Sequence, residues 1–75
     1  MRNKVILLLS EIRSEFDFNQ EVDFIESGML DSFDIVSLVT SLDEEFGISI
    51  NGTDILPDNF CTIDAIIQLL SKYNI

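Results

Sequence analysis

The chain has 75 residues, of which 4 are basic and 14 acidic, giving a formal net charge of −10 with no histidine. This length allows a single small domain over residues 1–75, and 47% of apolar residues is too many for a disordered polar tail. Because contacts with phosphate or anionic lipid need Lys and Arg, we expect no nucleic-acid partner and no membrane insertion, and we expect protein partners with basic patches.

The first predicted helix covers residues 3–16, because apolar side chains recur there at helical spacing. They are Val5, Leu8, Leu9, Ile12 and Phe16. Leu7 falls outside this stripe, so we expect it to be partly exposed or covered by a loop. The apolar run Val5–Leu9 is far shorter than the roughly 20 residues that span a bilayer, and Ser10-Glu11 ends it too early for a signal peptide.

Residues 17–31 show no periodicity and hold many turn-forming side chains, which predicts a long loop. Phe24 and Met29 are the expected apolar anchors of this loop, because a long loop in a small domain is usually held down by its own side chains. Gly28 is expected to supply a positive φ.

Residues 32–46 carry the clearest helical pattern. The apolar positions are Ile35, Val36, Leu38, Val39, Leu42 and Phe46. Asp31 or Ser32 can cap the start of this helix, and Gly47 is placed to end it in the left-handed conformation. Acidic residues crowd the last turn, where negative charge opposes the helix dipole, and such a local conflict is typical of a functional surface.

The rest of the chain predicts one short and one longer helical element. Ile48 and Ile50 are expected to plug the core from an extended loop, and a short helical turn near 54–57 is limited by Pro57. A last helix over 62–72 is capped by Thr62. The sequence therefore predicts an all-α fold, a four-helix bundle with three main helices and one short helix.

The acidic residues are unevenly placed. Thirteen of the 14 lie between Arg13 and Lys72, a stretch that contains no Lys or Arg. Scattered acids are ordinarily a solubilising surface, but the complete absence of basic residues favours a docking surface here. Crowded carboxylates are also expected to raise one another's pKa on folding, so that stability falls as the pH rises towards 7.

Ser32 lies where the loop meets the second helix, between the carboxyls of Asp31 and Asp34. A helix N-terminus offers free N–H groups that suit a phosphate ester, although spacing alone favours a simple cap. Without histidine or a Gly-x-Ser-x-Gly turn, the serine has no recognisable activating base, so we predict no enzyme. No window matches a calcium-binding loop, so no metal site is predicted. The single Cys61 allows no internal disulfide and fits a reducing, cytoplasmic location.

Three runs closely resemble the acyl carrier protein family: Asp31-Ser32-Phe33-Asp34, Val36-Ser37-Leu38-Val39 and Leu42-Asp43-Glu44-Glu45-Phe46-Gly47. The leading helix and the tail over 58–66 match the family's order of helices as well. The resemblance implies that Ser32 carries a 4′-phosphopantetheine arm, derived from coenzyme A and joined through a phosphodiester beside Asp31. The thiol of that arm holds acyl or aminoacyl groups as thioesters, so we expect a non-catalytic carrier.

Three features depart from the fatty-acid members: Phe33 in place of Leu, Ser37 in place of Glu, and the stretch Glu26–Asp31, which lacks their Leu-Gly-Ala-Asp form. That stretch looks closer to stand-alone carriers of D-alanyl, polyketide or peptide pathways. The implied partners are a phosphopantetheinyl transferase, an acyl- or aminoacyl-activating ligase, and downstream synthase or transferase enzymes that bind a monomeric carrier. The alternative is an acidic protein-interaction module without a prosthetic group.

A partner that draws the arm into its active site must grip the helix from which the arm grows. We therefore predict basic and apolar docking contacts along this helix. The predicted docking residues are Phe33, Asp34, Val36, Asp43, Glu44 and Glu45.

Overall fold

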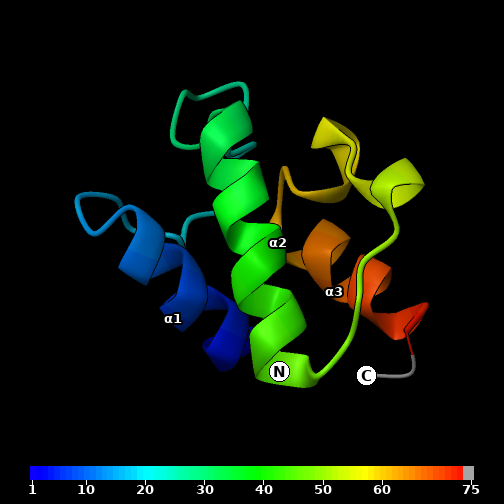
Figure 1. Cartoon of the computed structure of the whole chain (residues 1–75). Coiled ribbons are helices and arrows are strands. Elements are labelled where there is room, and N and C mark those ends of the chain that lie inside the picture. Colours follow the sequence, from blue (N-terminus) through cyan, green and yellow to red (C-terminus); the bar gives the residue numbers. More distant parts are fainter. Residues whose placement is uncertain (74–75) are drawn as a thin grey trace.

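The computed structural model describes residues 1–73, which form three α-helices and contain no strand. The helices are α1 (Arg2–Ile12), α2 (Ser32–Phe46) and α3 (Ile63–Ser71). Figure 1 shows α2 between the other two, and α1 packs against both α2 and α3. The predicted all-α class is therefore confirmed.

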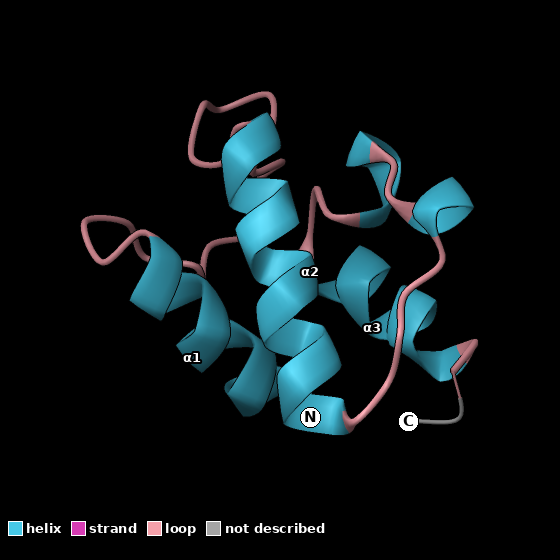
Figure 2. Ribbon diagram, in the orientation of Figure 1, coloured by secondary structure: helices cyan, strands magenta, loops and turns pink. Residues whose placement is uncertain are grey.

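Two short 3-10 turns, η1 (Gly52–Asp54) and η2 (Pro57–Asn59), occupy the segment where one short helical turn was expected near 54–57 (Figure 2). Pro57 begins the second turn at a position where its missing N–H costs no hydrogen bond, and it prevents the first turn from continuing. The short element is thus split into two, and neither part is an α-helix.

α1 ends four residues earlier than the predicted span of 3–16. Arg13 leaves the helical conformation, with φ −133° and ψ 82°, and its side chain turns towards the start of α2. Phe16, which was placed on the helix stripe, instead packs edge-on against Phe18 with ring centroids 6.4 Å apart. Leu7 is exposed, as its position off the stripe predicted.

The caps of α2 and α3 follow the sequence signals. Gly47 ends α2 in the left-handed conformation at φ 63°, and its N–H donates to the carbonyl of Asp43. The side chain of Thr62 accepts a hydrogen bond from the Ala65 amide at 3.0 Å, which starts α3. Both helices therefore have their predicted bounds to within one residue.

The core lies between the three helices and extends under both long loops. Its fully buried side chains are Val5, Leu9, Phe18, Phe24, Leu38, Leu42, Phe60, Ile66 and Leu70. Met29 and Ile50 are also buried, which confirms their predicted roles as loop anchors. Among the residues described, no helix is long and apolar enough to cross a membrane.

The loop before α2 is fixed at one central residue. The Phe24 amide donates to the carbonyl of Cys61 at 2.7 Å, and the Phe24 carbonyl accepts from the amides of Met29 and Leu30. Gly28 makes the intervening turn at φ 82°, as predicted. Because Leu30 is held in this way, the chain enters α2 from a defined position.

The loop after α2 is tied to the end of α3 by Asp54. Its carboxylate accepts from Lys72 at 2.8 Å and from the hydroxyl of Tyr73 at 2.7 Å, and that hydroxyl accepts from the Asn51 amide. These contacts join the last helix to a segment about twenty residues earlier, so both loops flanking α2 are anchored.

Candidate functional site

Ser32 is the first residue of α2, and its side chain is exposed. The N-terminal end of a helix carries a partial positive charge, and this end of α2 lies next to the hydroxyl. A partner protein can therefore reach Ser32 from outside, and an anion attached to it would meet the positive end of the helix dipole.

The start of α2 is closed by a reciprocal capping box, in which Asp31 and Asp34 each accept the other's amide. The Asp31 carboxylate receives the Asp34 N–H at 3.0 Å, and the Asp34 carboxylate receives the Asp31 N–H at 3.0 Å. Asp31, and not Ser32, is thus the cap, which leaves the serine hydroxyl outside the helix's own hydrogen bonds.

Arg13 contacts both carboxylates of the capping box. Its Nε lies 2.9 Å from Asp34 Oδ2, and one terminal nitrogen lies 3.3 Å from Asp31 Oδ2. The pKa of the Asp31 carboxyl is lowered by the Asp34 amide and, to a smaller degree, by Arg13. The pKa of Arg13 is raised, chiefly by its hydrogen bond to Asp34. No signal in the sequence had predicted this role for Arg13.

Asp34 does not occupy the exposed position that its predicted docking role requires. The residue is buried, with only 11% of its side chain exposed, because α1 delivers Arg13 onto it from the side. Asp43 is half-buried, and its carboxylate accepts the Ile50 amide at 2.9 Å, holding the loop after α2. Two of the predicted docking acids are therefore engaged within the fold.

The remaining predicted docking residues are exposed. Phe33 is 84% exposed and Val36 59% exposed, one helical turn apart beside Ser32. Such exposure is unusual for a large apolar side chain and is typical of an interaction site. Glu44 and Glu45 are exposed near the other end of α2, and Lys4 lies 3.4 Å from Glu45.

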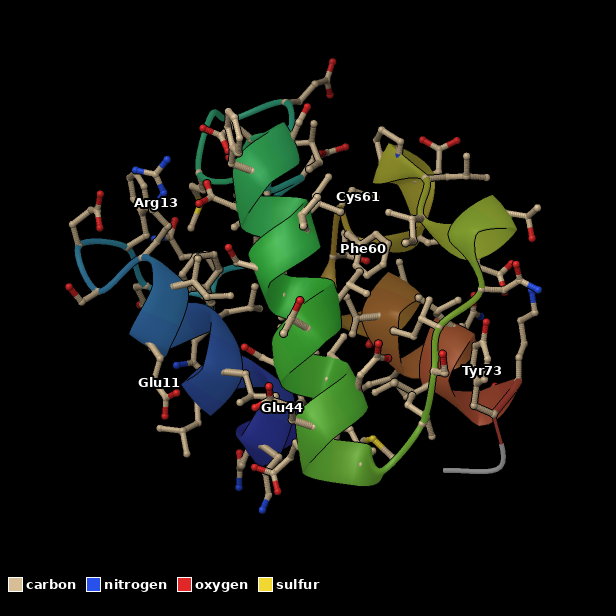
Figure 3. All side chains as sticks on the ribbon, viewed as in Figure 1. Glu11, Arg13, Glu44, Phe60, Cys61 and Tyr73 are labelled. Carbon is tan, nitrogen blue, oxygen red and sulfur yellow. The ribbon has the colours of Figure 1, made fainter. Side chains whose placement is uncertain are left out.

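Glu11 on α1 and Glu44 on α2 lie on neighbouring helices (Figure 3). They share a groove of about 350 Å³. Its lining residues are Leu8, Glu11, Ser41, Glu44 and Glu45. Replacing Glu11 with Lys would consequently change the electrostatic surroundings of Glu44. A variant at Glu11 is therefore unsuitable as a control for a variant at Glu44.

Acid destabilisation is expected from Asp31 and Asp54. The pKa of Asp54 is lowered by hydrogen bonds from Lys72 and Tyr73, and that of Asp31 by the Asp34 amide. When folding lowers a carboxyl's pKa, the unfolded chain binds more protons, so the stabilisation is present above about pH 4 and is lost as the pH falls further. This sign is opposite to the one expected from charge crowding.

Urea unfolding between pH 5 and pH 2.5 (roughly the range in which carboxyls titrate) measures this effect. We expect the wild type to lose stability as the pH falls, and Asp54→Asn to lose less over the same range. A wild type whose stability rises on acidification would show that crowding dominates, as the sequence analysis expected.

Besides Ser32, one more side chain considered from the sequence can act as a nucleophile, the thiol of Cys61. It is half-buried, and burial together with the nearby Asp23 raises the pKa of its thiol. Its sulfur is therefore a thiol and not a thiolate at neutral pH, which makes it a poor nucleophile. Among residues 1–73, no group of three His, Cys, Asp or Glu side chains is placed to hold a metal ion.

The family model described as "Phosphopantetheine attachment site" matches residues 7–70. The chain belongs to this family. A D-alanyl carrier protein of Bacillus velezensis (strain DSM 23117 / BGSC 10A6 / LMG 26770 / FZB42) is 29% identical over 73 residues, covering 95% of this chain and 94% of that protein. No solved structure matches at a significant level. The chain is thus a member of the acyl carrier protein family, near the D-alanyl carriers.

Membership implies covalently bound 4′-phosphopantetheine as the cofactor of this phosphopantetheine carrier, whose family is non-catalytic in general. The chemistry around Ser32 fits that group. A phosphodiester needs an accessible hydroxyl, which Ser32 provides, and its negative charge suits the first turn of α2. Arg13 adds the positive charge of a guanidinium next to Asp31.

Proposed function

We propose that this chain holds acyl or aminoacyl groups as thioesters on a 4′-phosphopantetheine arm attached to Ser32, and delivers them to partner enzymes without catalysing a reaction itself. The observation that carries the proposal is the exposed hydroxyl at the first residue of α2, within the family match over residues 7–70. Segment 52–59, with its two 3-10 turns, takes the place of the short helix expected of this fold. A cytoplasmic location stays part of the proposal, supported by the single cysteine.

We further propose D-alanine, or a similarly small aminoacyl group, as the cargo. Its support is the D-alanyl carrier protein that aligns with nearly the whole chain. The space between the helices is filled by fully buried side chains such as Leu38, Leu42 and Ile66. A long acyl chain would have to displace them, whereas a small cargo can stay outside the core. The expected partners are a transferase that supplies the arm and a ligase that activates the amino acid.

The test is loading in two steps. The purified chain is incubated with coenzyme A and a phosphopantetheinyl transferase, and its intact mass is measured. The loaded chain is then offered D-alanine with ATP and a D-alanine-activating ligase, or a long-chain fatty acid with ATP and an acyl-activating ligase. We expect one arm per chain, followed by transfer of a D-alanyl group to the thiol of the arm. Hydroxylamine should cleave the resulting thioester and restore the free thiol. A chain that accepts no arm would favour the acidic interaction module, and a loaded chain that accepts only the fatty acyl group would contradict the cargo.

The exposed face of α2 is the proposed docking surface for these enzymes. We define it by Phe33, Val36 and Glu44, which lie along one side of the helix. Glu44 is twelve residues beyond Ser32, about 18 Å along the axis at 1.5 Å per residue. An exposed aromatic side chain is the kind of residue that dominates a binding interface, whereas a rim charge mainly speeds association.

The double variant Phe33→Ala with Glu44→Lys should lower the kcat/KM of loading by about tenfold, which corresponds to roughly 1.4 kcal/mol. Leu7→Ala with Glu21→Lys is the matched control, because it makes the same kinds of change at exposed positions outside α2. Transferase kinetics at low and high salt provide the measurement. If both double variants slow loading equally, net charge and not the α2 face controls docking.

A further inference from the structure

We propose that Arg13 is the counter-ion of the attachment site: it partly compensates the negative charge of Asp31 and Asp34 so that the anionic phosphodiester can be added and tolerated at Ser32. This inference rests on the proposed attachment at Ser32. It assigns a positioning and charge-compensating role to the side chain directly after α1, which belongs neither to the serine signature nor to the docking face.

The first observation is the set of contacts that the guanidinium makes. Arg13 lies 2.9 Å from Asp34, 3.3 Å from Asp31 and 3.4 Å from Glu15. Asp31 and Asp34 are on either side of Ser32 in the sequence. Asp31 directly precedes Ser32, so the Cα atoms of Asp31 and Ser32 are about 3.8 Å apart. One guanidinium therefore holds both ends of the turn that presents the serine.

The second observation concerns the other cations. The chain has four Lys and Arg residues in all, and three of them form ion pairs elsewhere: Arg2 with Asp64, Lys4 with Glu45, and Lys72 with Asp54. Among residues 1–73, Arg13 is consequently the one basic side chain whose ion pairs flank Ser32. Within the same residues, the other Lys and Arg side chains pair elsewhere, so none is placed to replace it if its charge is removed.

The third step is electrostatic. The transferase adds a phosphodiester with one negative charge to a turn that already holds two carboxylates. A charge attached to Ser32 lies next to Asp31 in the chain, within the screening length of about 8 Å at physiological salt, so the two interact. With Arg13 present, part of this repulsion is compensated. Without Arg13, the arm's phosphate, Asp31 and Asp34 repel one another, and the loaded form suffers more than the unloaded form.

A purely structural role for Arg13 predicts something different. If the side chain only ties α1 to α2, removing it destabilises the unloaded and the loaded chain by the same amount. The difference between their melting temperatures separates the two roles, because a structural effect common to both forms cancels in it. The salt dependence of that difference is a second measure, since only the electrostatic effect is screened.

The experiment compares Arg13→Gln with Arg13→Lys and with Arg2→Gln, which removes one positive charge from the exposed pair with Asp64. Each variant is melted before and after loading, at low salt and at about 1 M salt, where the screening length is only about 3 Å. For Arg13→Gln at low salt we expect loading to lower the melting temperature by about 3 °C more than it does in the wild type. We also expect the kcat of loading to fall about fivefold with little change in KM.

Arg13→Lys should recover most of both effects, because it keeps the charge, and Arg2→Gln should behave as the wild type. If Arg13→Gln does not fold, Asp31→Asn tests the same charge balance, because it removes a negative charge while Asn keeps an effective cap. This variant should make the loaded form more stable relative to the unloaded form than it is in the wild type. The proposal is overturned if neither Arg13→Gln nor Asp31→Asn changes the difference between loaded and unloaded melting temperatures. A wild type that accepts no arm would instead refute the attachment at Ser32.

Discussion

Ser32→Ala should abolish loading by a phosphopantetheinyl transferase while leaving the domain folded. The phosphodiester would form at the Oγ atom of Ser32, so removing this hydroxyl leaves no site for the arm at the start of α2. The helix cap itself is the Asp31 side chain, which the substitution does not touch. We therefore expect a stability loss below about 1 kcal/mol and no added mass after treatment.

The matched control is Ser37→Ala, which removes another exposed hydroxyl from the same helix. We expect complete loading of this variant at the wild-type rate. The other serines are Ser10, Ser14, Ser27, Ser41, Ser49 and Ser71. Intact-mass analysis with peptide mapping decides between them, and an arm on Ser32→Ala would move the attachment to one of these positions.

Local signals in the sequence were sufficient to locate α2 and α3. Their caps depend on neighbouring residues: Asp31 and Gly47 bound α2, and Thr62 begins α3. Such signals involve side chains within about four positions of one another, so periodicity and capping chemistry can reveal them without a structure. Phe33, predicted from the sequence as a docking residue, is exposed beside Ser32.

The end of α1 and the role of Asp34 could not be predicted in this way, because both depend on a contact that is distant in the sequence. Arg13 bonds to residues 18 and 21 positions further along the chain. Its spacing from Asp31 and Asp34 follows no helical or strand period, and only the packing of α1 against α2 brings the three side chains together. Asp34 lies two residues past Ser32 on the helix that a partner must grip, and this local position is why the sequence predicted a docking role for it.

Asp34→Ala should therefore act on stability. The substitution removes the acceptor of the Asp31 amide and the main partner of Arg13. Losing the reciprocal half of the capping box costs up to about 1 kcal/mol, and a lost hydrogen bond to a charged group costs about 1.5–3 kcal/mol, with some overlap because one carboxylate makes both contacts. We expect a total of about 2–3 kcal/mol, a large share of the roughly 3–5 kcal/mol that a core of this size supplies.

In thermal unfolding this loss should appear as a fall of about 10–20 °C in the melting temperature. Asp64→Ala is the matched control, since Asp64 is also an aspartate in the first turn of a helix, paired with an arginine at 2.9 Å. Its side chain is 85% exposed, so that pair should contribute less than about 1 kcal/mol. Both residues are first-turn aspartates paired with an arginine, so the contrast measures what burial and the capping-box bond to the Asp31 amide add at Asp34. If Asp34→Ala melts like Asp64→Ala and only its loading is slowed, Asp34 contacts the transferase as the sequence first indicated, and its bond to Arg13 contributes little to the fold.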